Sequence, residues 1–403
     1  MKSVFTGVKI ADFTWYVAGP VVIKYFAEYG AQVIHVESST RIDGFRSSPP
    51  FKGESPAVNT SGLFATSNDN KYGITLNLKH QKGLGVAKRL VAWADVVAEN
   101  FTPGTMERLG LGYDELKKIN PRIIMFSTCN QGQTGPRRSQ PGFGSHLTAL
   151  AGFTSITGWP DRRPSVPWGP YTDYASIHLA TFALTAALEY QHRTGKGQHL
   201  DLSQYESSVH LLTPLLMDYQ VNGREFTRMG NRSQCAAPHG VYPCKGKERW
   251  CAIAIFSDDE WHRFCQVSKK HSWLSDPRFS TLTKRKENED ELDRLIGEWA
   301  KDFSAEELML MLQSVGISAG IVENTKDLSE DPQLKYRHYF KELEHPEIGK
   351  YLCEGNAFSL SKTLPDFRMS APCLGDHNEY VYTKVLGMSD EEFTELLSEG
   401  VFE

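Results

Sequence analysis

Residues 8–129 alternate between short apolar runs and amphipathic stretches, and this alternation limits the possible folds more than any other feature of the chain. The run VKIADF (Val8 to Phe13) predicts a strand, GPVVIKYFAEYG (Gly19 to Gly30) a helix and AQVIHVES (Ala31 to Ser38) a second strand. Further strand-like runs at 71–78, 95–100 and 122–129 alternate with helix-like stretches at 81–94 and 112–120. This order predicts an α/β fold with a Rossmann-like parallel sheet covered by helices.

Sequence motifs that identify common ligands of such sheets are missing. The chain reads WYVAGP (Trp15 to Pro20) after the first predicted strand, where a dinucleotide-binding protein carries G-x-G-x-x-G. Neither G-x-x-x-x-G-K-[ST] nor G-x-S-x-G occurs anywhere. The sequence therefore gives no support to a nicotinamide, P-loop or α/β-hydrolase function.

Composition changes along the chain and divides it into domains. A turn-rich stretch at 223–240 precedes strand-like residues and then a helical, charged region that ends near Asn324. The last fifty-odd residues return to the character of the first part. We predict a large α/β domain formed by residues 1–203 and 347–403, an inserted smaller α+β domain at 225–325, and linkers at 204–224 and 326–346.

Length and charge indicate an ordinary globular protein with a sizeable core. The 403 residues carry a formal net charge of −5, which argues against nucleic acid as the main partner. No apolar run reaches the ~18 residues of a membrane span, and the N-terminus has no signal-peptide pattern, so a cytoplasmic location without membrane attachment is expected. The seven cysteines form no C-x-x-C pair, which argues against a zinc site or a disulfide framework.

An aspartate stands in GPYTDYAS (Gly169 to Ser176), between a turn-rich stretch and a long helix-like segment. Asp173 has two interpretations. It is either a cap that accepts hydrogen bonds from the free N–H groups at the start of the helix, or a positioned anion with chemistry to perform. The residues around it leave this choice open.

Several blocks along the chain resemble the class III coenzyme A (CoA) transferases, the family that includes formyl-CoA and carnitine CoA transferases. The blocks are ADFTWYVAGP, GAQVIHVE, NKYGITLNLK, ADVVAENFTPGTMERLG, INPRIIMFS, PYTDY, HRTGKGQHLDLSQYE and PCLGDHN. Their order and spacing cover nearly the whole chain. The resemblance implies a large α/β domain with an inserted small domain, and subunits that form dimers interlinked like rings of a chain.

The resemblance also implies a reaction. Asp173 matches the family's catalytic aspartate, which attacks an acyl-CoA thioester and carries CoA as an aspartyl thioester after an anhydride stage. CoA esters are substrates, and neither a metal nor a tightly bound cofactor is implied. The CoA contacts carried over from the family fall on Val17, Ala18, Lys71, Leu76, Lys79, Asn100, Phe101, Thr102 and Arg108. Without the resemblance, a solvated surface charge is the preferred interpretation of each basic residue in this set.

Residues that are expected near the acyl group and the acceptor acid depart from the family pattern. Ser38 replaces an arginine of formyl-CoA transferase, which passes the basic role to Arg41. The loop CAAPHG (Cys235 to Gly240) replaces a glycine-rich loop and offers His239 as an acceptor-pocket residue, and Gly144 replaces a glutamate. Tyr171, Tyr174 and Trp168 are expected to wall the pocket or to be ordinary packing residues. These departures predict an acceptor acid larger than formate, such as an aryl-substituted succinate, carnitine or a 2-hydroxy acid, with succinyl-CoA as the donor.

Two alternatives remain. The related α-methylacyl-CoA racemases place a histidine where this chain has Phe143, and that substitution argues against racemisation. The other alternative is a catalytically silent partner subunit in a hetero-oligomer. A homodimer and a heterodimer with a related subunit are both compatible with the sequence.

Overall fold

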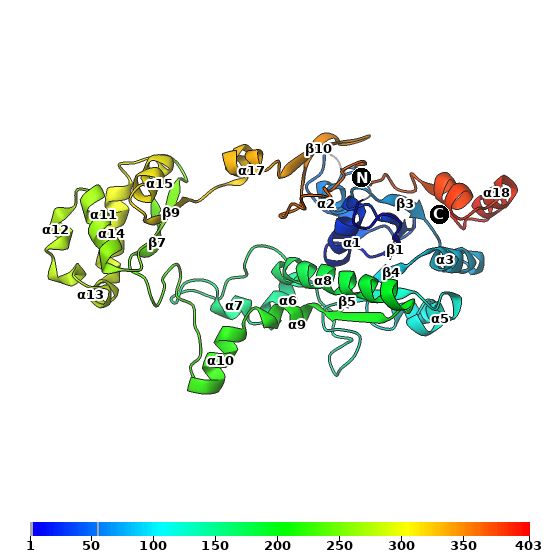
Figure 1. Ribbon diagram of the computed structural model, residues 1–403, viewed down its shortest axis with the longest axis horizontal. Helices are drawn as coiled ribbons and strands as arrows, with labels where there is room; N and C mark the ends of the chain where they lie inside the picture. The colour runs from blue at the N-terminus through cyan, green and yellow to red at the C-terminus, as the bar shows by residue number, and fades with distance from the viewer. Residues whose placement is uncertain (1–2, 55) are drawn as a thin grey trace. The chain divides into compact units, whose positions relative to one another are not determined.

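The computed structural model describes residues 3–54 and 56–403, which divide into two compact units (Figure 1). The large unit consists of Met1–Thr154, Val166–Glu225 and Lys335–Glu403. The small unit consists of Ser155–Ser165 and Phe226–Leu334. Each unit has its own hydrophobic core.

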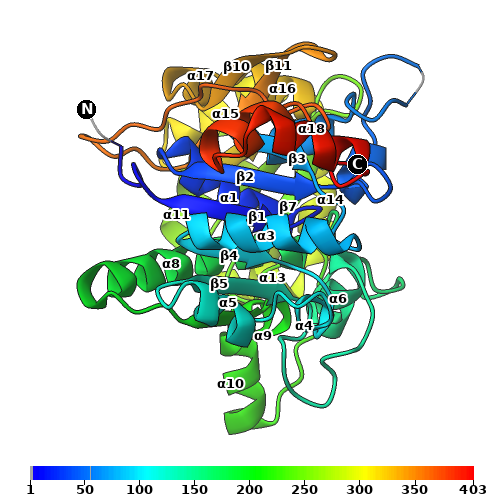
Figure 2. The ribbon, with the colours of Figure 1, turned by 90° about the vertical axis from the view of Figure 1, so that its right-hand side faces the viewer.

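A six-stranded parallel sheet forms the centre of the large unit. Its strands are β1 (Lys9–Phe13), β2 (Gln32–Glu37), β3 (Tyr72–Thr75), β4 (Val96–Glu99), β5 (Ile124–Cys129) and β6 (His199–Ser203). They are ordered β3-β2-β1-β4-β5-β6, and Figure 2 shows the first five in this order down the picture. The chain proceeds to opposite sides of β1, so β1 and β4 form the switch point at whose carboxyl ends ligands bind in such sheets.

Helices cover both faces of this sheet. On one face, α1 (Ala18–Glu28) and α8 (Tyr171–Thr194) pack over a core that includes Ile10, Val96 and Phe126. On the other face, α3 (Gln81–Trp93), α5 (Tyr113–Ile119) and α18 (Asp390–Ser398) contribute to a second core. The carboxyl-terminal α18 thus completes the domain that the amino terminus begins, as the red and blue segments of Figure 1 show.

Shorter elements complete the large unit. They are the 3₁₀ helix Gly44–Ser47, α2 (Gly62–Ser67), α4 (Thr105–Arg108), α6 (Gly144–Leu150), α9 (Gln204–His210), α10 (Thr213–Asn222), β10 (Phe340–His345), β11 (Gly349–Glu354) and the π-helix Tyr380–Val385. Strands β10 and β11 form an antiparallel hairpin. Two of the chain positions at which the units divide fall within short helices, α7 (Phe153–Ile156) and α17 (Pro332–Tyr336).

The small unit is an antiparallel sheet with helices packed against it. Its strands are β7 (His239–Pro243), β8 (Trp250–Ala254) and β9 (Ser318–Ile321), in that order. Its helices are α11 (Asp258–Val267), α12 (His271–Leu274), the 3₁₀ helix Pro277–Phe279, α13 (Leu282–Glu287), α14 (Glu289–Ala300), α15 (Ala305–Gln313) and α16 (Thr325–Glu330). Stacked aromatic rings of Trp261, Phe264 and Trp273 fill the core.

The observed architecture is the α/β class with a parallel sheet that the sequence predicts. The units differ from the predicted domains at three places. Residues 155–165 belong to the small unit, residues 204–224 form α9 and α10 of the large unit instead of a linker, and the predicted linker 326–346 is divided between the small unit, which runs to Leu334, and the large unit, which resumes at Lys335. Although α8 runs to 24 residues, no helix in the described part of the chain combines the length and apolarity needed to cross a membrane.

Candidate active site

Asp173 lies in the first turn of α8, at the edge of the sheet where the parallel strands end. Helix α8 lies between β5 and β6 in the chain, and these two strands are parallel neighbours. A helix that joins parallel neighbours runs opposite to them, so its first turn lies beside their carboxyl ends. The fold therefore brings Asp173 to the edge at which a ligand of this sheet is expected.

The carboxylate of Asp173 is half-buried and has no partner. Among residues 3–54 and 56–403, no hydrogen bond or ion pair to its oxygens is found, and burial raises its pKa from 3.8 to about 7. Pro170 occupies the N-cap position of helix α8, and no side chain forms a capping hydrogen bond there. The interpretation of Asp173 as a helix cap is therefore wrong, which leaves a positioned carboxyl group with free lone pairs.

Gly144 lies directly against this carboxylate. A Cβ atom at position 144 would overlap Oδ2 of Asp173 and Cβ of Pro170. The backbone of Gly144 is not in the left-handed region, so the glycine is needed here for space and not for conformation. The carboxyl group of Asp173 thus occupies the volume that a side chain at position 144 would take.

Aromatic side chains surround the start of α8 and stay exposed. Tyr171 packs against Phe153 with ring centroids 5.0 Å apart, and Tyr174 lies 6.4 Å from Trp168. Trp168 and Phe143 are 84% and 64% exposed, which is unusual for such large apolar groups. These side chains are available to cover a substrate at Asp173.

Two loops meet at the carboxyl ends of β1 and β4. The backbone N–H of Trp15 donates to Oδ1 of Asn100 (2.8 Å), and Nδ2 of Asn100 donates to the carbonyl of Trp15 (2.6 Å). The Phe101 ring stands edge-on to the Trp15 ring at 5.1 Å. The structure therefore brings together the predicted CoA-contact segments Val17–Ala18 and Asn100–Thr102. Val17 and Ala18 are almost completely buried.

Tyr16 links this loop to the surroundings of Asp173. Its backbone has φ of 66°, a strained conformation for tyrosine, and its N–H donates to the buried carboxylate of Asp43 (2.9 Å). Its ring lies 5.8 Å from Phe143, the residue before Gly144. A continuous line of contacts thus connects the β1 loop with Asp173.

The remaining predicted CoA contacts and Arg41 differ in their exposure. Arg41 is exposed in a tight turn closed by Ser38, with its guanidinium 6.0 Å from the Trp15 ring. Lys79, Thr102 and Arg108 are exposed as well, and Arg108 Nη2 donates to Thr105 Oγ1 (2.8 Å). Leu76 is buried in the core beyond β3.

Lys71 is not available to a ligand, which corrects its assignment as a CoA contact. Its side chain is fully buried, and its ammonium donates to Oδ2 of Asp12, the carbonyl of Pro20 and Oδ1 of Asn68, each at 2.9 Å. All three ammonium donors are used. The sequence shows a lysine in a family block, and only the packing shows that it is an internal ion-pair partner.

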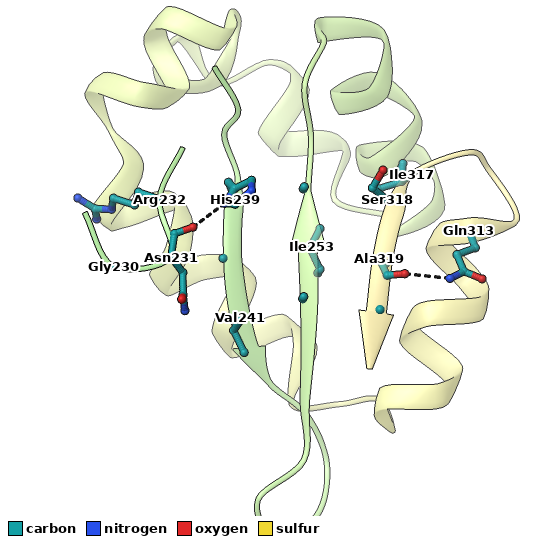
Figure 3. A pocket seen from close by; sticks show the side chains of 14 residues that line it. Gly230, Asn231, Arg232, His239, Val241, Ile253, Gln313, Ile317, Ser318 and Ala319 are labelled. Atoms are coloured by element: carbon teal, nitrogen blue, oxygen red, sulfur yellow. Dashed lines mark hydrogen bonds between the residues drawn. The ribbon is translucent and has the colours of Figure 1, made fainter. Parts of the chain in front are cut away.

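His239 belongs to the small unit, where it lines a cavity of about 710 Å³ (Figure 3). Its Nδ1 is hydrogen-bonded to the carbonyl oxygen of Asn231. A carbonyl oxygen only accepts, so Nδ1 is the donor of this hydrogen bond. Arg232, Val241, Ile253 and Ser318 also line this cavity. A role for His239 beside the acceptor acid stays a prediction.

Sequence reasoning missed a buried charge network beneath the two loops. Arg46 binds Glu37 through Nε (2.9 Å) and Nη2 (2.8 Å), and Glu37 Oε1 accepts the N–H of Asp43 (2.8 Å). His35 lies between Asp12 and Glu37, with Nδ1 3.2 Å from Asp12 and Nε2 3.7 Å from Glu37. The signal was present, because Asp12, His35 and Glu37 interrupt otherwise apolar central strands.

The profile of CoA-transferase family III matches residues 5–378. The chain belongs to this family. It is 32% identical over 394 residues to succinyl-CoA–D-citramalate CoA-transferase of Chloroflexus aurantiacus, covering 98% of this chain and 97% of that one. It is 30% identical to human succinyl-CoA:glutarate CoA-transferase, covering 98% and 89%.

Solved structures agree with this membership. A CAIB/BAIF family protein from Brucella suis superposes with a TM-score of 0.88 at 28% identity, covering 96% of this chain and 100% of that one. The resemblance inferred from the sequence blocks is confirmed, and the protein is a CoA-transferase.

Proposed function

We propose that this CoA-transferase moves CoA from succinyl-CoA to a free carboxylic acid larger than formate, with Asp173 as the nucleophile. The observation that carries the proposal is the carboxyl group of Asp173, which is half-buried and unpartnered at the ligand edge of the sheet. Burial raises its pKa to about 7, and a more basic carboxylate is a stronger nucleophile. The amino-terminal end of α8 favours its anionic form during attack.

The chemistry proceeds through two anhydrides and one thioester. Asp173 Oδ attacks the thioester carbonyl, the C–S bond breaks, and a mixed anhydride and CoA thiolate result. The thiolate attacks the aspartyl carbonyl of the anhydride, which forms an aspartyl-CoA thioester and releases the donor acid. The acceptor carboxylate then attacks this thioester, and the freed thiolate takes the acyl group from the second anhydride. Asp173 is regenerated and no electrons are gained or lost.

Water must be excluded while these intermediates exist, because both anhydrides and thioesters hydrolyse. The exposed rings of Trp168, Tyr171, Tyr174 and Phe143 supply apolar surface around Asp173. We propose that these rings close over the bound acyl group, which explains why such large side chains are exposed here.

CoA is proposed to bind along the two loops at the switch point. Backbone groups of Val17, Ala18 and Phe101 face the pantetheine arm. The exposed cations nearby, Arg41, Lys79 and Arg108, meet the phosphates.

The acceptor is proposed to be a short dicarboxylic acid. The relatives named above act on D-citramalate and glutarate. Gly144 carries no side chain, so the glutamate that accompanies formate is missing beside Asp173. Aryl-substituted succinates, carnitine and monocarboxylic 2-hydroxy acids are the acceptors to compare.

Assembly with a second subunit is proposed from the outer surface of α8 and α10. Leu179 and Phe182 are exposed on α8, and Phe182 reaches 74% exposure. Helix α10 projects from the rest of the large unit in Figures 1 and 2, and no residue of it is buried although it carries several exposed apolar side chains. Such a surface fits an interface with another copy or with a related subunit.

One experiment separates transfer from racemisation. The protein is incubated in deuterated water with succinyl-CoA and one acid at a time, including citramalate, glutarate, carnitine, benzylsuccinate and formate. We expect new CoA esters of the dicarboxylic acids without deuterium at the α-carbon. Rapid α-deuteration without transfer would establish the racemase alternative, and the absence of both would favour a silent subunit that needs a related partner.

A further inference from the structure

Two buried threonines join the first turns of α6 and α8. Thr148 and Thr172 are both fully buried. Oγ1 of Thr148 donates to the carbonyl of Gly144 (2.7 Å), and Oγ1 of Thr172 donates to the same carbonyl (3.0 Å). The two hydroxyl oxygens are 3.4 Å apart. One carbonyl oxygen therefore holds hydroxyl groups from two helices.

Thr148 also satisfies a backbone group that α8 itself leaves free. The first N–H groups of a helix have no partner within it, and Pro170, the residue before α8, has no side-chain acceptor. Oγ1 of Thr148 accepts the N–H of Thr172 at 3.4 Å. The start of α8 is thus capped by a side chain of another helix, which ties the two helix ends together.

The hydrogen-bonded junction of Thr148, Thr172 and Gly144 adjoins Asp173 both in sequence and in space. Thr172 directly precedes Asp173, and Gly144, whose carbonyl the threonines hold, contacts the carboxylate through its Cα side. Because no residue in the described part of the chain donates a hydrogen bond to the carboxylate of Asp173, its place depends on the backbone of the first turn of α8 and on the contact with Gly144. Both depend on the two hydroxyl groups.

We propose that Thr148, Thr172 and Gly144 are positioning residues that hold the Asp173 carboxylate in its attacking place while leaving its lone pairs free. The inference rests on the proposed function of Asp173. A hydrogen bond to the carboxylate would lower its nucleophilicity, whereas a clamp on the adjacent backbone fixes its position without that effect. A displacement of about 1 Å of a reacting group reduces a rate by about 10²-fold.

The test uses an exchange that needs no knowledge of the acceptor. The protein is mixed with succinyl-CoA and ¹³C-labelled succinate, and the transfer of label into succinyl-CoA is measured by mass spectrometry. For Thr172→Val, which keeps the shape and removes the hydroxyl, we expect kcat to fall about 10- to 100-fold with KM for succinyl-CoA unchanged. Thr172→Ser should restore the rate.

The matched control is Thr185→Val. Thr185 is an exposed residue of the same helix, and its hydroxyl donates to the carbonyl four residues before it (2.8 Å). The substitution Thr185→Val removes the same kind of hydrogen bond at a position far along the helix from Asp173, and it should leave kcat unchanged. If Thr172→Val only lowers the melting temperature and the folded enzyme keeps its kcat, the positioning role is wrong.

A second pair of variants covers the case in which Thr172→Val does not fold. Gly144→Ala introduces the Cβ that overlaps Asp173 Oδ2, and Gly85→Ala in α3 introduces one into open space. We expect a loss of kcat for the first and none for the second. Equal rates for both would overturn the contact between Gly144 and Asp173 as a determinant of catalysis.

Crystal structures of wild type and Thr172→Val supply a readout that does not depend on activity. The carboxylate of Asp173 should lie away from Gly144 in the variant. An unmoved carboxylate overturns the clamp whatever the kinetics. Wild-type protein that fails to exchange label, with a displaced carboxylate in the variant, would contradict the proposed function and leave the clamp supported.

Discussion

Asp12 and Asp173 are two aspartates at the same edge of one sheet, and their surroundings are opposite. Asp12 lies in β1 and is fully buried. Burial by itself would raise the pKa of Asp12, but the ammonium of Lys71 at 2.9 Å and the ring of His35 hold it well below its usual range. Thr14 donates both its N–H and its hydroxyl to Oδ1.

Asp173 is less buried, yet its pKa moves the other way, to about 7, because desolvation acts on it without any compensating partner. The comparison shows that burial alone does not decide the state of a carboxyl group. A full set of donors makes Asp12 a structural anion whose lone pairs are occupied. The absence of donors makes Asp173 a group that can form a new bond.

The largest expected effect follows from removing the free carboxylate. Asp173→Asn should lower the rate of CoA exchange between succinyl-CoA and labelled succinate by about 10³-fold or more, because an amide is a poor nucleophile. Since Asp173 caps no helix, we expect the variant to fold normally. Retention of more than about a tenth of the wild-type rate would refute the nucleophile assignment.

Substitution of the other aspartate, Asp12, should affect the stability of the fold instead of the transfer rate. Asp12→Asn leaves the Lys71 ammonium buried without its anion, and the free energy of unfolding measured in urea should fall by about 3–5 kcal/mol. The double variant Asp12→Asn/Lys71→Met should recover part of this loss. Lys82→Met, which removes an exposed ion pair with Glu395, is the control and should change stability by at most about 1 kcal/mol.

The two pKa shifts also predict the pH dependence of activity. Asp173 must be ionised to attack, so kcat/KM for succinyl-CoA should fall about tenfold for each pH unit below its pKa of about 7. Asp12 stays ionised throughout this range and contributes no step. Calorimetric titration of CoA over the same range separates a loss of binding from a loss of attack. A rate that stays constant down to pH 5 would contradict the raised pKa.

The smallest effect concerns stability against pH. The folded state holds the proton of Asp173 more tightly than the unfolded chain, whose carboxyl has a pKa near 3.8. Wild-type stability should therefore fall as the pH rises from about 4 to about 7, while Asp173→Asn lacks this dependence. We expect the melting temperature of the variant to exceed that of wild type by a few degrees at pH 8, with the gap closing toward pH 4.

Local patterns in the sequence are enough to predict the secondary-structure elements and to single out Asp173 as the proposed nucleophile. Apolar periodicity is a local property of the sequence. It is therefore sufficient to predict the strands around Val8–Phe13 and Ala31–Ser38 and the helix between them. The family blocks point to Asp173 as the proposed nucleophile, and the structure contradicts its alternative role as a helix cap.

Tertiary structure alone decided which polar groups became neighbours. Lys71 meets Asp12 across 59 positions of sequence, and Thr148 meets Thr172 across 24. Local patterns carry no information on such pairs, because a hydrogen bond needs atoms within about 3 Å and only the packing of whole helices and strands sets distances on that scale. Lys71 is therefore an internal ion-pair partner instead of a ligand contact, while Asp173, with Gly144 against it, has a carboxylate to which no residue in the described part of the chain donates a hydrogen bond.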